Sequence, residues 1–122
     1  HYGNPHFVTF VEHDPMAIAL TYGPELETNK HFPDRANISF VRVFEDTLEA
    51  VVFERGVGIT QACGTGACAI GVAAIRAGYR EFESPISVQL PGGVLKITIT
   101  TSYETTMNGP SMPVFQGEVS GV

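Results

Sequence analysis

A cysteine at the start of an apolar segment is the residue in this sequence best suited to do chemistry. Cys63 follows a loop with two glycines and directly precedes Gly64-Thr65-Gly66 and an apolar run. A helix that starts here presents backbone N–H groups and a partial positive charge, which favour a thiolate and bind a carboxylate. A packing cysteine would behave as a small hydrophobic residue and would not need glycines around it. The sequence therefore predicts a proton-exchanging thiol beside a carboxylate-binding site.

Two charged residues, Glu54 and Arg55, end the strand that leads into this loop. Neighbouring residues of a strand point to opposite faces of a sheet, so the two side chains share a pocket only if the backbone bends. Gly56 and Gly58 follow directly and are able to supply such a bend. Two interpretations therefore stay open: a solvated residue beside a salt-bridged one, or two charges in one binding site.

The second cysteine, Cys68, is predicted to belong to the core. It lies five residues further along the predicted helix. It is thus turned by roughly 500° and displaced by about 7.5 Å from Cys63, so it points elsewhere. The four histidines show no metal-ligand spacing, and His13 and His31 are predicted to lie on the surface. We therefore predict no zinc site and no other metal site.

Three further polar residues lie close to predicted strand ends. Asn4 and His6 flank Pro5 in a compact turn, and Asn37 precedes an apolar strand. Residues of these types often serve a turn alone, so on their own they do not separate a binding role from a structural one.

Length, composition and charge narrow the class of protein. The 122 residues allow one domain at most, and 43% hydrophobic residues support an ordinary soluble core. A net charge of -6 argues against nucleic acid as the main partner, and we find neither a membrane span nor a signal peptide in the sequence. Two cysteines give no secreted disulfide framework, which favours a reduced, cytoplasmic setting. The first residue is not methionine, which suggests a fragment of a longer protein.

Periodicity and turn residues predict the elements that must position these groups. Asp14-Pro15 is typical of a helix start, and Gly23-Pro24 is predicted to interrupt that helix. Residues 64–77 have helical spacing and no polar face, so this helix should be buried on all sides and should end at Gly78. The pattern predicts an α+β fold, with a curled and mostly antiparallel sheet around a central buried helix. The predicted strands are 7–12, 38–44, 48–53, 86–90, 94–100 and 114–119, with a tight connection at 45–47 and one more helical turn at 25–30.

Taken together, these segments resemble the diaminopimelate epimerases, in collinear order through nearly the whole chain. The sequence Ala62-Cys63-Gly64-Thr65-Gly66-Ala67 is shared in part with proline racemases and hydroxyproline epimerases. Two motifs, Glu54-Arg55-Gly56-x-Gly58 and Gly3-Asn4-Pro5-His6, narrow the resemblance to the diaminopimelate enzymes. The family pattern is also matched at Phe32-Pro33, Asn37, Pro91-Gly92-Gly93, Met107-Asn108-Gly109-Pro110 and Val114-Phe115-Gln116-Gly117-Glu118.

This resemblance implies an amino-acid epimerase of lysine and peptidoglycan precursor synthesis. Such an enzyme interconverts LL- and meso-2,6-diaminopimelate without pyridoxal phosphate, metal or another cofactor. The family has two similar α+β domains with the active site between them, and two cysteines, one from each domain, act as base and acid on opposite faces of the α-carbon. Residues 1–122 would form the C-terminal portion, without the first strands of that domain and without the whole N-terminal domain.

The resemblance also implies roles for individual residues. Cys63 would be the cysteine of the C-terminal domain, and the backbone N–H groups of Gly64 and Thr65 would bind the reacting carboxylate. Glu54 would hold the reacting ammonium group. The distal amino-acid end would be read by Asn4, Asn37 and Arg55, and the cysteine pKa values would be modulated by His6 and Glu54.

The sequence departs from the family pattern in ways that bear on activity. The Gly-Asn-Gly motif of the partner cysteine does not occur, Ile59 replaces a usually acidic residue, and Tyr2 replaces a common Met. Inversion needs a proton-transfer group on each face of the carbon, so this chain alone is predicted to be inactive and poorly self-supporting. The expected partners are the small molecule diaminopimelate and the N-terminal domain with the second cysteine. A homodimer is left open, and neither nucleic acid nor a membrane is expected.

Three other functions stay open on the residues alone. One is a related proline or hydroxyproline-type racemase, although its substrate would leave Arg55, Asn4 and Asn37 without partners. Another is a ligand-binding protein without catalysis that retains the helix-terminus site. The last is a cysteine hydrolase that uses Cys63 and His6.

Overall fold

A computed structural model describes residues 5–61, 64–109 and 112–118 of the chain. These residues form one eight-stranded sheet and two helices. The elements in chain order are β1 (His6–Phe10), α1 (Pro15–Thr28), β2 (Asn37–Val43), β3 (Leu48–Glu54), β4 (Gly58–Thr60), α2 (Gly64–Arg76), β5 (Ile86–Leu90), β6 (Gly93–Ile99), β7 (Glu104–Gly109) and β8 (Met112–Glu118).

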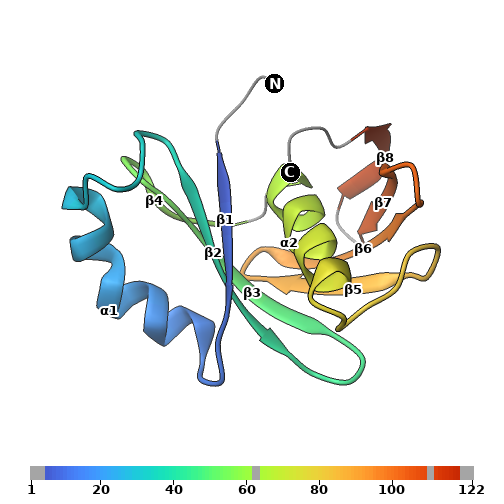
Figure 1. Cartoon of the computed structure of the whole chain (residues 1–122), viewed down its shortest axis with the longest axis horizontal. Coiled ribbons are helices and arrows are strands. Elements are labelled where there is room, and N and C mark those ends of the chain that lie inside the picture. The colour runs from blue at the N-terminus through green and yellow to red at the C-terminus, as the bar shows by residue number, and fades with distance from the viewer. Residues whose placement is uncertain (1–4, 62–63, 110–111, 119–122) are drawn as a thin grey trace.

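The sheet is mixed, mostly antiparallel and curled. Its strand order is β1-β2-β3-β5-β6-β7-β8, and β4 pairs with β3 beside this path. Two neighbouring pairs are parallel, β1 with β2 and β3 with β5, and their connections contain α1 and α2 respectively. Helix α1 covers one face, whereas α2 lies on the other face between β1 and the strands β5 to β8 (Figure 1). The predicted α+β fold, with a sheet curled around a helix, is therefore confirmed.

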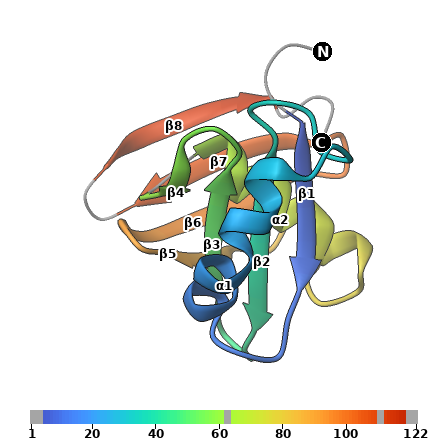
Figure 2. The same cartoon turned by 90° about the vertical axis from the view of Figure 1, so that its left-hand side faces the viewer.

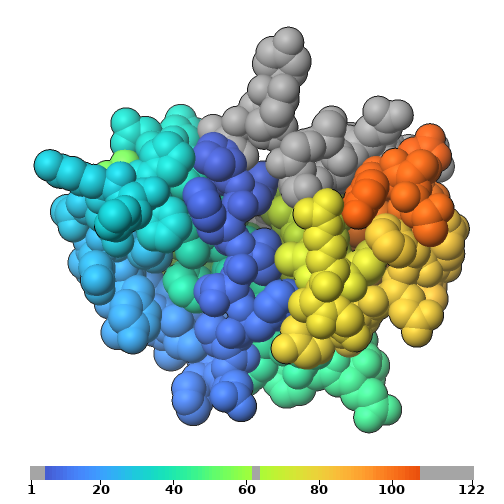
Figure 3. Space-filling view, viewed as in Figure 1, coloured from blue at the N-terminus to red at the C-terminus, as the bar shows by residue number. Residues whose placement is uncertain are grey.

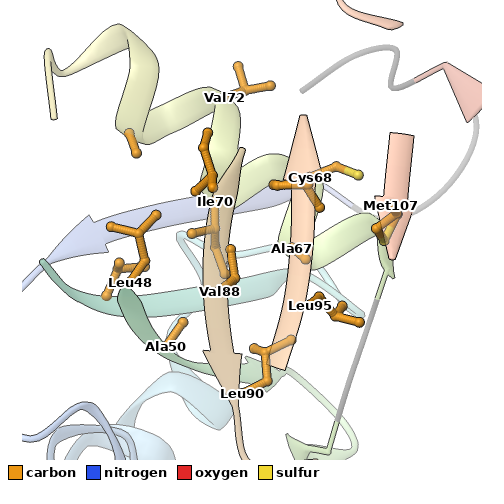
Figure 4. Packing of buried hydrophobic residues seen from close by; sticks show 14 of the residues in the cluster. Leu48, Ala50, Ala67, Cys68, Ile70, Val72, Val88, Leu90, Leu95 and Met107 are labelled. Atoms are coloured by element: carbon orange, nitrogen blue, oxygen red, sulfur yellow. The ribbon is translucent and has the colours of Figure 1, made fainter. Parts of the chain in front are cut away.

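Helix α2 is the centre of the larger hydrophobic core. Its residues Ala67, Cys68 and Ile70 are at most 1% exposed and pack with Leu48, Val88 and Leu95 of the sheet (Figure 4). Gly71 lies so close to the sheet that a Cβ atom there would be 2.5 Å from Cδ1 of Ile97. The prediction that Cys68 belongs to the core is confirmed.

The prediction that α2 is buried on all sides is wrong for one side of the helix. Ala73 and Ile75 are half-buried, and Thr65 and Arg76 are exposed. The reason is the shape of the sheet, because α2 contacts β1, β2, β5 and β6 and the remaining side of the helix faces away from these strands.

Gly78 ends α2 in the way the sequence predicts. Its φ of +88° is left-handed, its N–H donates to the carbonyl of Ile75 at 3.0 Å, and the N–H of Tyr79 donates to the carbonyl of Ala74 at 2.9 Å. These two bonds form a Schellman motif, which satisfies carbonyl groups at the helix end.

A Gly78→Ala variant is expected to lower the free energy of unfolding by about 1 kcal/mol, because an L-residue with a side chain is disfavoured in the left-handed region. A Cβ at this position would meet no atom within 4 Å, so the cost is one of backbone conformation and not of crowding. Amide hydrogen exchange of α2 measures the change. Gly78→Asn is the matched control and should recover part of the loss, since asparagine tolerates this conformation. Equal losses for Ala and Asn would contradict this explanation.

Helix α1 begins as predicted but continues further. Asp14 is the N-cap, and its carboxylate accepts a hydrogen bond from the N–H of Met16 at 3.1 Å. The predicted interruption at Gly23-Pro24 is wrong, because the helix runs through both residues to Thr28. Gly23 allows a close approach to Phe53, since a Cβ there would be 3.1 Å from Cε2 of that ring. Packing of α1 on the sheet therefore outweighs the proline (Figure 2). The core on this face contains Ala19, Leu26, Ile38, Phe40, Val51 and Phe53.

All six predicted strands are present with bounds moved by at most two residues, and two strands were missed. The three-residue β4 turns back along β3 after the glycine loop. Strand β7 pairs with β6 and β8 and carries only one large apolar side chain, that of Met107. Strands of this kind form because both neighbours supply ladder bonds, not because the segment itself has a strong apolar pattern.

Candidate active site

Three of the predicted site residues lie side by side across neighbouring strands. His6 of β1 is in register with Asn37 of β2, and Asn37 is in register with Glu54 of β3. Residues that are directly opposite on paired strands point to the same face of the sheet. Val52 comes two residues before Glu54 on that same face of β3 and belongs to the core around α2. His6, Asn37 and Glu54, here called the polar row, therefore lie on the α2 face at one end of the sheet.

The His6 end of the polar row faces α2. His6 and Val8 line a cavity of about 380 Å³ together with Ala69, Val72 and Ala73 of the helix. In Figure 3, β1 is visible on the surface beside α2. The imidazole Nδ1 is buried and finds no hydrogen-bond partner among the described residues. Burial lowers the pKa of His6 from its ordinary value of 6.5, because desolvation disfavours the charged imidazolium.

This shift gives a prediction for pH dependence. Because the folded-state pKa of His6 lies below the unfolded value of 6.5, the unfolded chain binds more protons between the two values. The contribution of His6 to stability is therefore fully present above the unfolded pKa and is lost as the pH falls through the folded pKa. An NMR titration of the imidazole should give a lower pKa in the native protein than in concentrated urea. His6→Gln should remove this part of the acid destabilisation, and equal native and urea pKa values would contradict the prediction.

Glu54 is half-buried and ion-paired. Its side chain is 14% exposed, and its Oε2 accepts a hydrogen bond from Nε of Arg35 at 2.5 Å. Arg35 comes from the loop before β2 and has a left-handed φ of +67°. The carboxylate at this end of the polar row is thus already matched with a cation from the same chain.

Arg55 follows the strand and is held on the α1 side. Its Nε donates to the carbonyl of Leu26 at 3.1 Å, and its Nη1 donates to Oδ1 of Asp34 at 2.5 Å. Leu26 belongs to the core under α1, so Glu54 and Arg55 point to opposite faces, as strand alternation requires. The structure does not bring them into one pocket, and both are salt-bridged.

The two glycines after Arg55 make a turn and do not carry Arg55 to the face of Glu54. Gly56 and Gly58 have φ values of +96° and +109°, which allow the chain to reverse into β4. The N–H of Gly56 donates to Oε1 of Glu27 at 2.6 Å, which fastens the turn to α1. Ile59 of β4 packs against the core under α1.

The remaining predicted site residues belong to the start of α2 or lie outside the described residues. Gly64 and Thr65 are the first residues of α2, where the partial positive charge of a helix is concentrated. Gly64 lies near Met107 of β7, since a Cβ there would be 3.4 Å from its Sδ. Cys63 and Asn4 fall outside the described residues.

Residues that the sequence reasoning missed lie around the charged pair. Arg55 is paired with Asp34, and Glu54 is paired with Arg35. The turn after them is held by Glu27. The available signal was two opposite charges directly after Phe32-Pro33 and just before Asn37.

His13 and His31 are exposed, as predicted. Within the described ranges, no three residues of the types His, Cys, Asp or Glu gather closely enough to hold a metal ion. Neither helix in this part of the chain has the length and apolar character needed to cross a membrane.

Comparison with known proteins places these features in one family. The family model for diaminopimelate epimerase matches residues 1–114. A diaminopimelate epimerase of Bacillus cereus is 47% identical over 94% of this chain, and one of Sphingopyxis alaskensis is 49% identical over 95%. The chain spans 40% and 43% of the length of these two relatives. The extent of the family match and the identity to these enzymes show that this chain belongs to the diaminopimelate epimerase family.

Proposed function

We propose that this chain is the C-terminal portion of an enzyme that interconverts LL- and meso-2,6-diaminopimelate by proton transfer between two cysteines. The relatives are named diaminopimelate epimerases, and the chain spans about two fifths of their length. The observation that carries the proposal is the polar row, in which strand pairing brings together three residues that are distant in the sequence. A proline-type racemase is less well supported, because the matched family and relatives are those of the diaminopimelate enzyme.

In this proposal, Cys63 supplies one of the two proton-transfer groups. A thiolate on one face of the substrate takes the α-proton, and the electron pair of the broken C–H bond stays on the carbon and its carboxylate. A thiol from the N-terminal domain delivers a proton to the opposite face, so the carbon is inverted and the two sulfur atoms exchange protonation states. Backbone N–H groups of Gly64 and Thr65 stabilise the negative charge that develops on the carboxylate.

The remaining residues bind and orient the substrate. Glu54 holds the ammonium group of the reacting end, and Arg55 contacts the distal carboxylate together with Asn4 and Asn37. His6 lies at the far end of the polar row, where its half-buried imidazole, whose pKa is lowered by desolvation, influences the protonation of the cysteines. Because one thiol serves one face only, the chain alone is inactive and acts together with the N-terminal domain. We place the complete enzyme in the cytoplasm.

The test compares two proteins. The complete protein consists of this chain preceded by its N-terminal portion. In D₂O the complete protein should convert LL-diaminopimelate to the meso isomer with one deuterium at the inverted carbon, as measured by NMR and mass spectrometry. The 122-residue chain alone should do neither. Exchange by the isolated chain would refute the two-thiol division, and an inactive complete protein would refute the epimerase function.

A further inference from the structure

Two adjacent residues of opposite charge contact the two predicted recognition side chains. Asp34 and Arg35 lie in the loop before β2, and Asp34 pairs with Arg55 while Arg35 pairs with Glu54. The loop adopts a left-handed φ of +67° at Arg35, which is uncommon for a residue with a side chain. One short loop thus supplies a carboxylate to the arginine and a cation to the glutamate.

The two members of each pair differ strongly in exposure. The side chains of Glu54 and Arg55 are 14% and 15% exposed, whereas those of Arg35 and Asp34 are 61% and 94% exposed. Ion pairs with a well-solvated partner contribute little to stability and are screened by salt. Glu54 and Arg55 are therefore the fixed members of the two pairs. Their exposed partners, Arg35 and Asp34, can be replaced by other groups of the same charge.

Arg55 and Glu54 would keep their places without these outer partners. Arg55 has a second contact, from its Nε to the carbonyl of Leu26 at 3.1 Å, and the turn after it is fastened by Glu27. Glu54 is held by the backbone ladder with Asn37. A substrate group could therefore replace Asp34 or Arg35 without rebuilding the site.

We propose that Asp34 and Arg35 are internal counterions that occupy the carboxylate and ammonium sites until the substrate displaces them. The proposal rests on the proposed function, because diaminopimelate carries carboxylate and ammonium groups at both ends. Glu54 and Arg55 point to opposite faces, but they are the last residue of β3 and the residue directly after it, so the two sites are one residue apart along the chain. The substrate carboxylate takes the place of Asp34 on Arg55, and the substrate ammonium takes the place of Arg35 on Glu54.

If an internal counterion occupies the site for part of the time, the apparent Kd for the substrate equals the intrinsic Kd divided by the fraction of time that the site is free. Asp34→Asn in the complete protein is therefore expected to lower KM and the Kd for diaminopimelate about two- to fivefold, with kcat unchanged, as for an exposed ion pair that is formed most of the time. Arg35→Gln should act in the same direction. Steady-state kinetics gives KM and kcat, and calorimetry gives Kd without requiring turnover.

Matched controls remove the same charges elsewhere. Asp46→Asn, the control for Asp34→Asn, removes a carboxylate from the exposed turn between β2 and β3. Lys96→Gln, the control for Arg35→Gln, removes a cation from an exposed position of β6. Both controls should leave KM and Kd unchanged. A higher or unchanged Kd for both Asp34→Asn and Arg35→Gln, in a protein whose wild type binds and epimerises diaminopimelate, would overturn the counterion proposal alone. A wild-type complete protein that neither binds nor exchanges diaminopimelate would overturn the proposed function and the counterion role together.

Discussion

Cys63→Ser in the complete protein is expected to lower kcat for inversion of diaminopimelate by about 10³-fold, the range typical of removing a general acid or base. A serine hydroxyl does not ionise near neutral pH, whereas a thiol at a helix N-terminus readily forms the thiolate. The change in KM should be small, because the groups proposed to bind the substrate are retained. NMR detection of deuterium incorporation measures both parameters.

The second cysteine provides a matched control for this variant. Cys68 is 1% exposed within the core around α2, and Cys68→Ala should keep kcat while it lowers stability. A ligand-binding protein without catalysis would keep its function after the Cys63→Ser substitution. Retained inversion by Cys63→Ser would remove Cys63 from the mechanism, whereas loss of inversion in a folded Cys68→Ala variant would show that the loss is not specific to Cys63.

Ile70→Ala is expected to lower the free energy of unfolding of this domain by about 3 kcal/mol, within the usual range for truncating a buried isoleucine. Ile70 is 0% exposed and lies in the middle of α2 against Leu48 and Val88 (Figure 4). The cavity left by truncation would be enclosed by the helix and the sheet, so little relaxation is available.

Amide hydrogen exchange of β3 and β6 in the complete protein is a suitable measurement, because it reports the opening free energy of these strands independently of the other domain. Leu20→Ala is the control, since Leu20 is 63% exposed on α1 and its truncation removes little buried surface. We expect less than about 0.5 kcal/mol for that variant. Equal effects of the two truncations would contradict a core centred on α2.

Local signals predicted the helix starts and the fold class. The apolar run after Gly64 indicated a helix inside a curled sheet, and Asp14 and Gly78 marked a helix start and a helix end. The continuation of α1 past Pro24 was not predicted, because it depends on contact with Phe53, which is distant in the sequence. Strand β7 did show a short alternation, with Thr105 and Met107 buried, but the alternation is too brief to be distinctive.

The candidate site was predicted as a set of residues but not as an arrangement. The Glu54-Arg55 pair and Asn37 stood out in the sequence, yet their alignment with His6 depends on the parallel pairing of β1 with β2 across a long connection. The partners of the pair, Asp34 and Arg35, could not be assigned because surface charges have no periodicity that reveals their contacts. Strand alternation and loop geometry decide these contacts, and both are properties of the folded chain.

The join between β3 and β5 has a consequence for how the molecule would come apart under load. Its ladder contains two registered pairs, Leu48 with Val88 and Glu49 with Gln89, whereas β2 and β3 share seven. Helix α2 contacts β1 and β2 on one side of this join and β5 and β6 on the other. A pulling force should therefore separate the sheet into two halves at this join once α2 is released.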